Sequence, residues 1–133
     1  MLILAVKQKD AIEAYKQILN EYKDPKIVSF VAGIKSKKYI KLNQDIQFLR
    51  AMPNTSARFN LGITAIYNSS FSKNNLAKIS RLFKKIGIVM NLDNEAKIDT
   101  FTGMIGSGPA YFFYLLKSYE KKLMSLCNKI RKK

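Results

Sequence analysis

The sequence predicts an α/β fold with a parallel sheet, followed by an all-helical segment. Residues 2–6 form a short, continuous apolar run, as expected for a strand buried on both faces, and residues 27–31 are expected to form a second buried strand. The amphipathic pattern of residues 10–22 lies between them. This strand, helix, strand order predicts a βαβ unit with a right-handed crossover. Strand patterns stop near residue 94, so we divide the chain into residues 1–94 and a helical part at 95–133.

The middle of the chain continues the alternation of strands and helices. We expect a helix or turn at 35–42, strands at 45–50, 64–67 and 88–92, and a helix at 72–86 capped by Gly87. Pro53 and Asn54 predict a turn at the carboxyl end of the strand at 45–50. Open α/β sheets bind their ligands at such ends, which makes this turn a candidate site.

A glycine-rich run at residues 101–111 predicts the start of a long helix. Gly106 and Gly108 permit a tight turn, Ser107 or Gly108 could cap the helix, and Pro109 suits its first turn. The aromatic helix at 110–122 is apolar enough to be buried in a core or a partner. A free helix N-terminus after glycines could receive an anion; a helix start without a ligand is the alternative.

The composition excludes several kinds of chemistry. The chain has no histidine, so serine–histidine triads, cysteine–histidine dyads and ordinary zinc sites are not expected. We therefore expect no metal site. The single cysteine, Cys127, fits a reducing cytoplasm, and no segment approaches the ~20 apolar residues of a membrane helix, so no membrane association is expected.

The formal net charge of +15 suggests nucleic acid as a partner, but the distribution of charge does not support this. The basic residues are mostly lysines scattered in small groups, and the arginines that commonly read base edges are only Arg50, Arg58, Arg81 and Arg131. We interpret the charge as a solvated basic surface without a nucleic-acid partner. A small basic nucleic-acid-binding protein remains an alternative.

Four motifs together resemble one enzyme family. They are Leu-Ala-Val-Lys at 4–7, Ser-Phe-Val-Ala-Gly-Ile at 29–34, Arg-Ala-Met-Pro-Asn-Thr at 50–55 and Gly-Ser-Gly-Pro-Ala-Tyr at 106–111. Their content, order and spacing resemble those of pyrroline-5-carboxylate reductases. The resemblance implies a Rossmann-type domain that binds NADPH or NADH, then a helical domain that dimerises, so a homo-oligomer is expected. It also implies hydride transfer to the C=N bond of 1-pyrroline-5-carboxylate, which yields L-proline.

The resemblance also assigns residues to the site. The positions expected beside the cofactor are Ala5, Val6, Lys7, Ala32 and Asn54, with Met52 and Pro53 lining the cleft. Glu95 is expected near the ring nitrogen of the substrate, where a carboxylate would favour the protonated iminium. Its alternative role is structural, as an acid in the first turn of a helix. Ser107 and Gly108 are expected at the substrate end of the cleft, and no residue is assigned as catalytic.

Some family features are not found in the sequence. Gln8 stands where the family usually has proline and Ile105 where it has serine, and no Gly-x-Gly-x-x-Gly phosphate-binding turn occurs. We therefore expect a partial Rossmann-type domain lacking its first βαβ, followed by the beginning of a helical dimerisation domain. An unpaired sheet edge would then favour marginal stability or aggregation. A non-catalytic remnant of a disrupted reductase gene is the main alternative.

Overall fold

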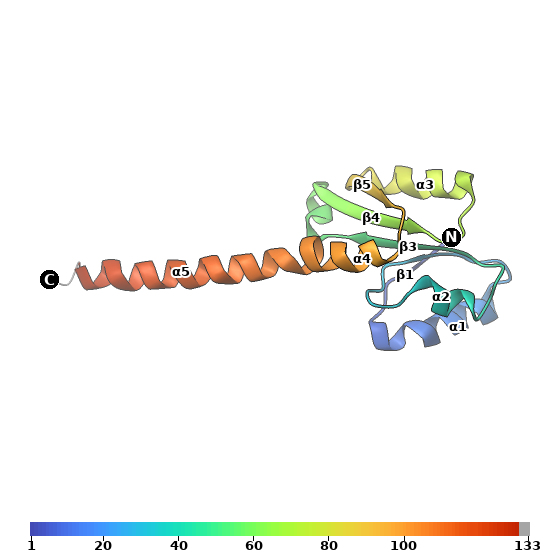
Figure 1. Ribbon diagram of the computed structural model, residues 1–133, viewed down its shortest axis with the longest axis horizontal. Coiled ribbons are helices and arrows are strands. Elements are labelled where there is room, and N and C mark those ends of the chain that lie inside the picture. Colours follow the sequence, from blue (N-terminus) through green and yellow to red (C-terminus); the bar gives the residue numbers. More distant parts are fainter. Residues whose placement is uncertain (131–133) are drawn as a thin grey trace.

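The computed structural model describes residues 1–130 and contains one five-stranded sheet with helices on both faces (Figure 1). The strands are β1 (Leu2–Leu4), β2 (Lys26–Ser29), β3 (Gln47–Pro53), β4 (Gly62–Asn68) and β5 (Gly87–Leu92). The α-helices are α1 (Ala11–Glu21), α2 (Ser36–Ile40), α3 (Lys73–Phe83), α4 (Ala96–Phe101) and α5 (Gly108–Ile130). Short 3₁₀ turns η1 (Gln8–Asp10) and η2 (Thr55–Phe59) follow β1 and β3.

The sheet is mostly parallel and keeps the order of the sequence, β1-β2-β3-β4-β5. Strands β1, β2 and β3 pair in parallel, with Leu4 opposite Ser29 and Ser29 opposite Arg50. Strand β4 runs antiparallel to β3, and β5 runs parallel to β4. The α/β fold class and the βαβ unit β1-α1-β2 are thus confirmed.

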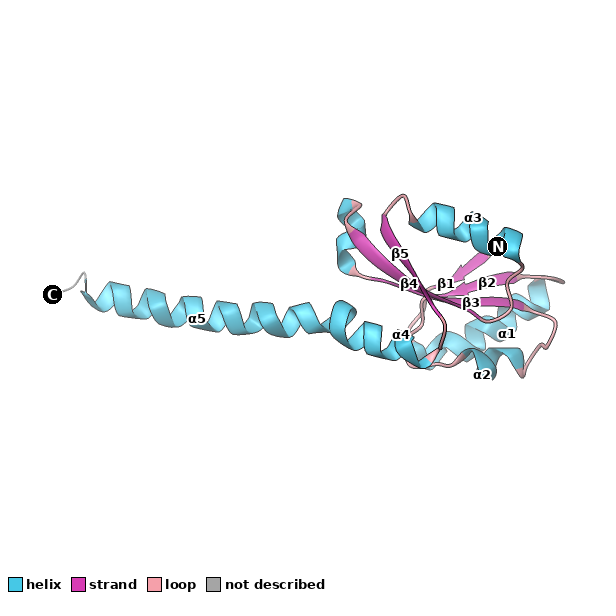
Figure 2. Ribbon diagram, turned by 45° about the horizontal axis from the view of Figure 1, so that its top comes forward, coloured by secondary structure: helices cyan, strands magenta, loops and turns pink. Residues whose placement is uncertain are grey.

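Helices α1, α2 and α4 lie on one face of the sheet and α3 on the other (Figure 2). The first face carries a core cluster that includes Ile27 and Phe48, and the second carries a cluster that includes Val28 and Leu49. Neighbouring residues of one strand therefore point into different cores, because successive side chains of a strand alternate between faces. This alternation explains why β2 and β3 carry apolar residues on both faces of the sheet.

The prediction of a strand buried on both faces at residues 2–6 is wrong. Only residues 2–4 form β1, and Ile3 is 50% exposed while Leu4 is 2% exposed. Within the described chain β1 is an edge strand with β2 as its one neighbour, and the two faces of the sheet are not covered equally there. Continuous apolar character in the sequence could not distinguish an edge position from a central one.

Two other boundaries differ from expectation for reasons of pairing. Strand β3 continues through Pro53, beyond the expected end at residue 50, because β4 pairs antiparallel with it as far as Pro53 opposite Thr64. Helix α3 ends at Phe83, so Gly87 is not its cap and instead begins β5 with a φ of +143°. Its predicted N-terminus is confirmed, because the Ser72 hydroxyl accepts a hydrogen bond from the Asn75 amide at 3.3 Å.

The tight turn predicted at Gly106 and Gly108 is also wrong. The backbone is helical from Ala96 to Ile130, with a π-helical turn, η3 (Thr102–Ser107), between α4 and α5. Gly108 has φ −52° and ψ −47°, so neither Ser107 nor Gly108 caps a helix, and the free helix N-terminus predicted to receive an anion does not exist. Pro109 gives the physical reason, since proline lacks an N–H and clashes with the carbonyl four residues earlier, and a π turn accommodates it without ending the helix.

Helix α5 projects away from the sheet and the other helices (Figure 1). Its aromatic side chains are exposed within the described chain, with Tyr111 at 75% and Phe113 at 67%. The prediction that a core buries this helix is therefore wrong for the chain by itself, whereas burial in a partner stays a prediction. No helix among residues 1–130 is long and apolar enough to cross a membrane.

An aromatic group in the first core leads to a prediction about pH. The Tyr15 ring lies edge-on to Tyr39 at 5.0 Å between centroids, and within the described residues the buried Tyr15 hydroxyl has no hydrogen-bond partner. Burial, with a smaller contribution from Tyr39, raises the pKa of Tyr15 from 10.0 to about 12. The pKa of Tyr15 is higher in the folded chain than in the unfolded chain. Ionisation of Tyr15 therefore leaves the free energy of unfolding unchanged below pH 10.0 and lowers it as the pH rises through about 12.

We therefore expect Tyr15→Phe to raise the free energy of unfolding by about 1 kcal/mol near neutral pH, since it removes an unpartnered buried hydroxyl. It should also reduce the loss of stability at alkaline pH, as measured by urea unfolding at a series of pH values. Tyr22→Phe is the control, because Tyr22 is 52% exposed. Equal pH dependence in Tyr15→Phe and the unmodified chain would contradict the assignment.

Candidate active site

The carboxyl ends of β1, β2 and β3 form one edge of the sheet, and the predicted cofactor positions follow these ends. Because Leu4, Ser29 and Arg50 are in register, the segments that continue from them leave the sheet at the same edge. Ala5, Val6 and Lys7 follow β1, Ala32 follows β2 and Asn54 follows β3. Ala5, Val6, Lys7 and Ala32 are exposed, and Asn54 is half-buried. The topology thus brings all five to one accessible edge.

Two local contacts shape this edge. The Asn54 side chain accepts a hydrogen bond from the Ile63 amide at 3.0 Å, which ties the turn after β3 to the beginning of β4. Gly33 has a φ of +71°, and a Cβ added there would lie 2.9 Å from the side-chain Nε2 of Gln8. The end of the Gln8 side chain therefore lies against Gly33, and the positive φ makes glycine the residue best suited to this position.

Ser107 and Gly108 lie on the helix that leaves the sheet at the same end. The π turn η3 contacts β3, and Figure 1 shows α5 leaving on the side where β3 ends. Ser107 is exposed and Gly108 is half-buried. Their predicted contact with a substrate stays a prediction, but η3, which ends at Ser107, contacts the strand that Asn54 follows.

Glu95 is held inside the chain rather than free in solvent. Its Oε1 accepts hydrogen bonds from the Ser36 amide at 2.6 Å and from Nη1 of Arg50 at 3.0 Å, and its Oε2 accepts one from the Ser36 hydroxyl at 3.0 Å. The Glu95 side chain is 16% exposed and that of Arg50 is 1% exposed. The role of Glu95 near a substrate stays a prediction, and the structural alternative has these three contacts in its favour.

Sequence reasoning did not identify Arg50, Ser36 and Asp99 as part of this group. One signal was present, because Arg50 is the one charge inside the apolar run of β3, and a buried guanidinium requires partners. A second signal was the spacing of Glu95 and Asp99, four residues apart and so on the same side of a helix. The partner at Ser36 has no local signal, since it lies 59 residues from Glu95.

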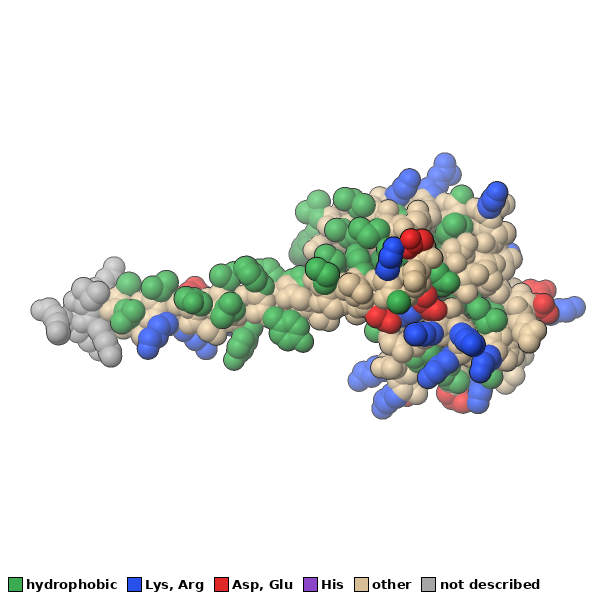
Figure 3. Space-filling view, in the orientation of Figure 1, with side chains coloured by type: hydrophobic (Ala, Val, Ile, Leu, Met, Phe, Trp, Pro, Cys, Tyr) green, Lys and Arg blue, Asp and Glu red, His purple; other side chains and the backbone are tan. Residues whose placement is uncertain are grey.

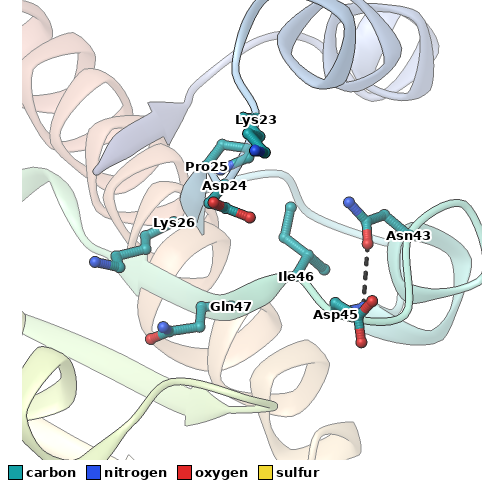
Figure 4. Close-up of a pocket in the computed structure, with 8 residues that line it drawn as sticks. All are labelled: Lys23, Asp24, Pro25, Lys26, Asn43, Asp45, Ile46 and Gln47. Carbon is teal, nitrogen blue, oxygen red and sulfur yellow. Dashed lines mark hydrogen bonds between the residues drawn. The ribbon is translucent and has the colours of Figure 1, made fainter.

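Two hollows lie outside the positions predicted from sequence. One, of about 320 Å³, is lined by Gly33, Lys35, Lys37, Lys38 and Lys41 at α2, in the region where Figure 3 shows basic side chains gathered. The other, of about 300 Å³, lies at the amino ends of β2 and β3 (Figure 4). It is lined by Lys23, Asp24, Pro25, Lys26, Asn43, Asp45, Ile46 and Gln47. No group of three or more metal-ligating side chains occurs among the described residues.

Curated proteins related in sequence carry one description. The chain is 37% identical over 126 residues to pyrroline-5-carboxylate reductase 1 of Bacillus spizizenii, covering 91% of this chain and 41% of the relative. It is 37% identical over 122 residues to pyrroline-5-carboxylate reductase of Pseudomonas aeruginosa, covering 89% of this chain and 44% of the relative. No family model matches the chain.

Solved structures agree with this result. The pyrroline-5-carboxylate reductase of Streptococcus pyogenes superposes with a TM-score of 0.78 at 28% identity, covering 92% of this chain and 47% of that protein. The Plasmodium falciparum pyrroline carboxylate reductase, solved with NADP bound, shares the fold with a TM-score of 0.79 at 21% identity, covering 87% and 45% of the two chains. Over 91% of its length, this chain therefore belongs to the pyrroline-5-carboxylate reductase family, and it spans about two-fifths of the curated relatives it matches.

Proposed function

We propose that this chain contributes the nicotinamide end of the cofactor site and part of the substrate site of a pyrroline-5-carboxylate reductase. The reaction would be the NAD(P)H-dependent reduction of 1-pyrroline-5-carboxylate to L-proline. The observation that carries the proposal is the convergence of Ala5–Lys7, Ala32 and Asn54 at one carboxyl edge, because α/β sheets bind nucleotides there. The names of the related proteins support the choice of reaction.

The residues at this edge fit a flat ring. Ala5, Ala32 and Gly33 present little or no side chain, so a planar group could approach the backbone closely, and all three are exposed. Lys7 adds an exposed positive charge near the same place, which would favour an anionic ligand. The bound nicotinamide would supply the hydride, while the protein would orient the ring against the substrate.

Ser107 and Gly108 are proposed to face the substrate from the helix that passes β3. The Ser107 hydroxyl could donate or accept a hydrogen bond, and Gly108 would let the substrate approach the helix closely. The proposed contribution of Glu95 is its negative charge, which would favour a protonated iminium nitrogen nearby. Because Glu95 already accepts three hydrogen bonds, that contribution would be electrostatic rather than a proton transfer.

Nuclear magnetic resonance can test the cofactor site without any turnover. Titrating the isotope-labelled chain with NADPH, and in parallel with NADH, should shift the backbone amides of residues 5–7, 32 and 54 before others. Ala32→Leu should weaken binding by about 10-fold, since a bulky side chain would occupy the approach of the ring. The two titrations would also establish which nucleotide is preferred.

Ala77→Leu is the matched control, because Ala77 is exposed on α3, on the opposite face from α1 and α2. It should leave NADPH binding unchanged. Shifts confined to the lysines around Gly33–Lys41 would show that charge, rather than the sheet edge, attracts the nucleotide. The absence of any saturable shift would reject the proposed cofactor site and favour the non-catalytic alternative. NADPH oxidation in the presence of 1-pyrroline-5-carboxylate then tests the reaction itself.

We also propose that α5 associates with a second copy of the chain, as the family resemblance implies. Exposed apolar side chains along α5 support this, and Figure 3 shows that apolar atoms continue from this helix onto the neighbouring end of the sheet. Exposed apolar surface of this kind is typical of an interaction site.

The single cysteine supports a reducing cytoplasm as the compartment. We propose no nucleic-acid partner for the chain.

A further inference from the structure

Arg50 is buried, at a position where a charged side chain is costly unless it has partners of opposite charge. It stands in the middle of β3, is 1% exposed, and shares its face of the sheet with Phe48 and with helices α2 and α4. Removing a guanidinium from water costs several kcal/mol in practice, so a buried arginine requires acidic partners close by. The residues that it contacts therefore indicate what its charge does.

Both acidic partners lie at the N-terminal end of the continuous helix formed by α4, η3 and α5. Nη1 of Arg50 lies 3.0 Å from Oε1 of Glu95, and Nη2 lies 3.5 Å from Oδ1 of Asp99. Glu95 immediately precedes α4 and Asp99 lies within it, one helical turn further on. The planar fork of a guanidinium can hold two carboxylates in a fixed relation, which a lysine cannot do.

Glu95 passes this connection on to a third element. Its carboxylate accepts hydrogen bonds from both the amide and the hydroxyl of Ser36, the first residue of α2. Ser36 is 5% exposed and follows the loop that carries Ala32 and Gly33. One guanidinium therefore connects β3, α4 and, through Glu95, the loop after β2.

Two apolar side chains of α4 are also buried against the sheet. Ile98 is fully buried and Phe101 is 7% exposed, so they hold α4 on the sheet. The hydrophobic effect is not directional, whereas the charge-assisted hydrogen bonds of a guanidinium have a preferred geometry. Because α4, η3 and α5 are continuous, any rotation of α4 would move Ser107, Gly108 and all of α5.

We propose that Arg50 is a positioning residue that fixes the direction of the long helix relative to the carboxyl edge of the sheet, acting through Glu95, Asp99 and Ser36. On the proposed function, it would set the place of Ser107 and Gly108 beside the cofactor edge. The proposal can be tested without cofactor or substrate, so its failure is distinguishable from failure of the proposed function. On this proposal, the primary role of Glu95 is structural, as the ion-pair partner of Arg50.

Spin labels can measure the direction of the helix. Cys127 is exposed near the far end of α5 and is the only cysteine in the sequence, so Lys78→Cys on α3 provides a second label in the sheet domain. Helix α5 has 23 residues and is thus about 34 Å long, so a tilt of about 10° moves its far end by ~6 Å. Double electron–electron resonance, which measures the distance between the two spin labels, would detect such a change.

The test variant combines Arg50→Met, Glu95→Gln and Asp99→Asn, which removes the ion pairs without leaving a buried charge alone. We expect the distribution of label distances to broaden by about two-fold or more, because the helix would no longer be held in one direction by ion pairs at its N-terminal end. Exchange of the Ser36 amide hydrogen should rise by about 10-fold relative to core amides such as Val28. A folded variant, as judged by circular dichroism, with an unchanged distribution would overturn the proposal.

Lys97→Met is the matched control. It removes the exposed ion pair between Lys97 and Asp93, which are 2.6 Å apart on the same segment, so the distance distribution should not change. Should the triple variant fail to fold, Arg50→Lys decides the question, because lysine keeps the positive charge beside Glu95 and Asp99 but lacks the planar fork that holds both carboxylates. Broadening in Arg50→Lys but not in Lys97→Met supports the proposal, and equal distributions in both reject it.

Discussion

Gly87→Ala is expected to destabilise the fold by about 3 kcal/mol or more, since the added carbon would overlap backbone that cannot move away. Gly87 begins β5 with a φ of +143°, and a Cβ built there would lie 1.9 Å from the Gly62 carbonyl oxygen. Gly62 is itself opposite Gly87 in the β4–β5 ladder. The substitution would therefore separate the two strands as well as strain the backbone. Urea unfolding followed by circular dichroism would measure the loss.

Gly103→Ala is the matched control for this prediction. No atom outside its own helix lies within 4 Å of a Cβ built at Gly103, and the residue lies in the helical stretch between Ala96 and Ile130. Alanine is the better helix former by about 1 kcal/mol, so this variant should be as stable as the unmodified chain or more so. Similar losses in Gly87→Ala and Gly103→Ala would show that the close approach of β4 and β5 is not what requires glycine.

Phe48→Ala is expected to cost about 3–5 kcal/mol, the usual effect of removing a fully buried aromatic ring. Phe48 is completely buried in the first core cluster, with its ring stacked on Tyr39 at 4.6 Å between centroids. Tyr15 also lies edge-on to it at 6.2 Å. The variant would thus leave a cavity below β3 and remove two aromatic contacts. The free energy of unfolding from urea titration is the measurement.

Phe59→Ala provides the comparison on the surface. Phe59 is 64% exposed, with the Arg58 guanidinium 4.8 Å from the centre of its ring. Loss of this exposed contact should cost no more than about 1 kcal/mol. If Phe48→Ala cost as little as Phe59→Ala, the aromatic cluster could not be the centre of the first core.

The pattern of apolar residues in the sequence was sufficient to predict the alternation of strands and helices. The period of about 3.6 residues at 10–22 and 72–86 predicted α1 and α3 to within a few residues of their ends. Four motifs in order were sufficient to indicate the family, which the related sequences and structures support. The expected cofactor positions all followed strands, so their meeting at one edge depended only on the strands being parallel.

The errors concern burial and backbone conformation rather than the order of the elements. Residues 2–6 were expected to be buried because they are apolar, yet Ile3 is exposed because of the place of β1 in the sheet. Gly106 and Gly108 were expected to make a turn, yet the helix continues through them, whereas Gly87 requires its conformation because of Gly62. Composition indicates which residues can adopt an unusual conformation, but not where one is needed.

The sequence by itself determined the class of fold, the family and the order of elements that carry the candidate site. These features depend on local periodicity and on short motifs, which are complete within a few residues of chain. Only the tertiary structure decided that Glu95 is held by Arg50 and Ser36, which lie 45 and 59 residues away from it. A carboxylate takes its role from the donors that surround it, and folding rather than local sequence brings those donors together.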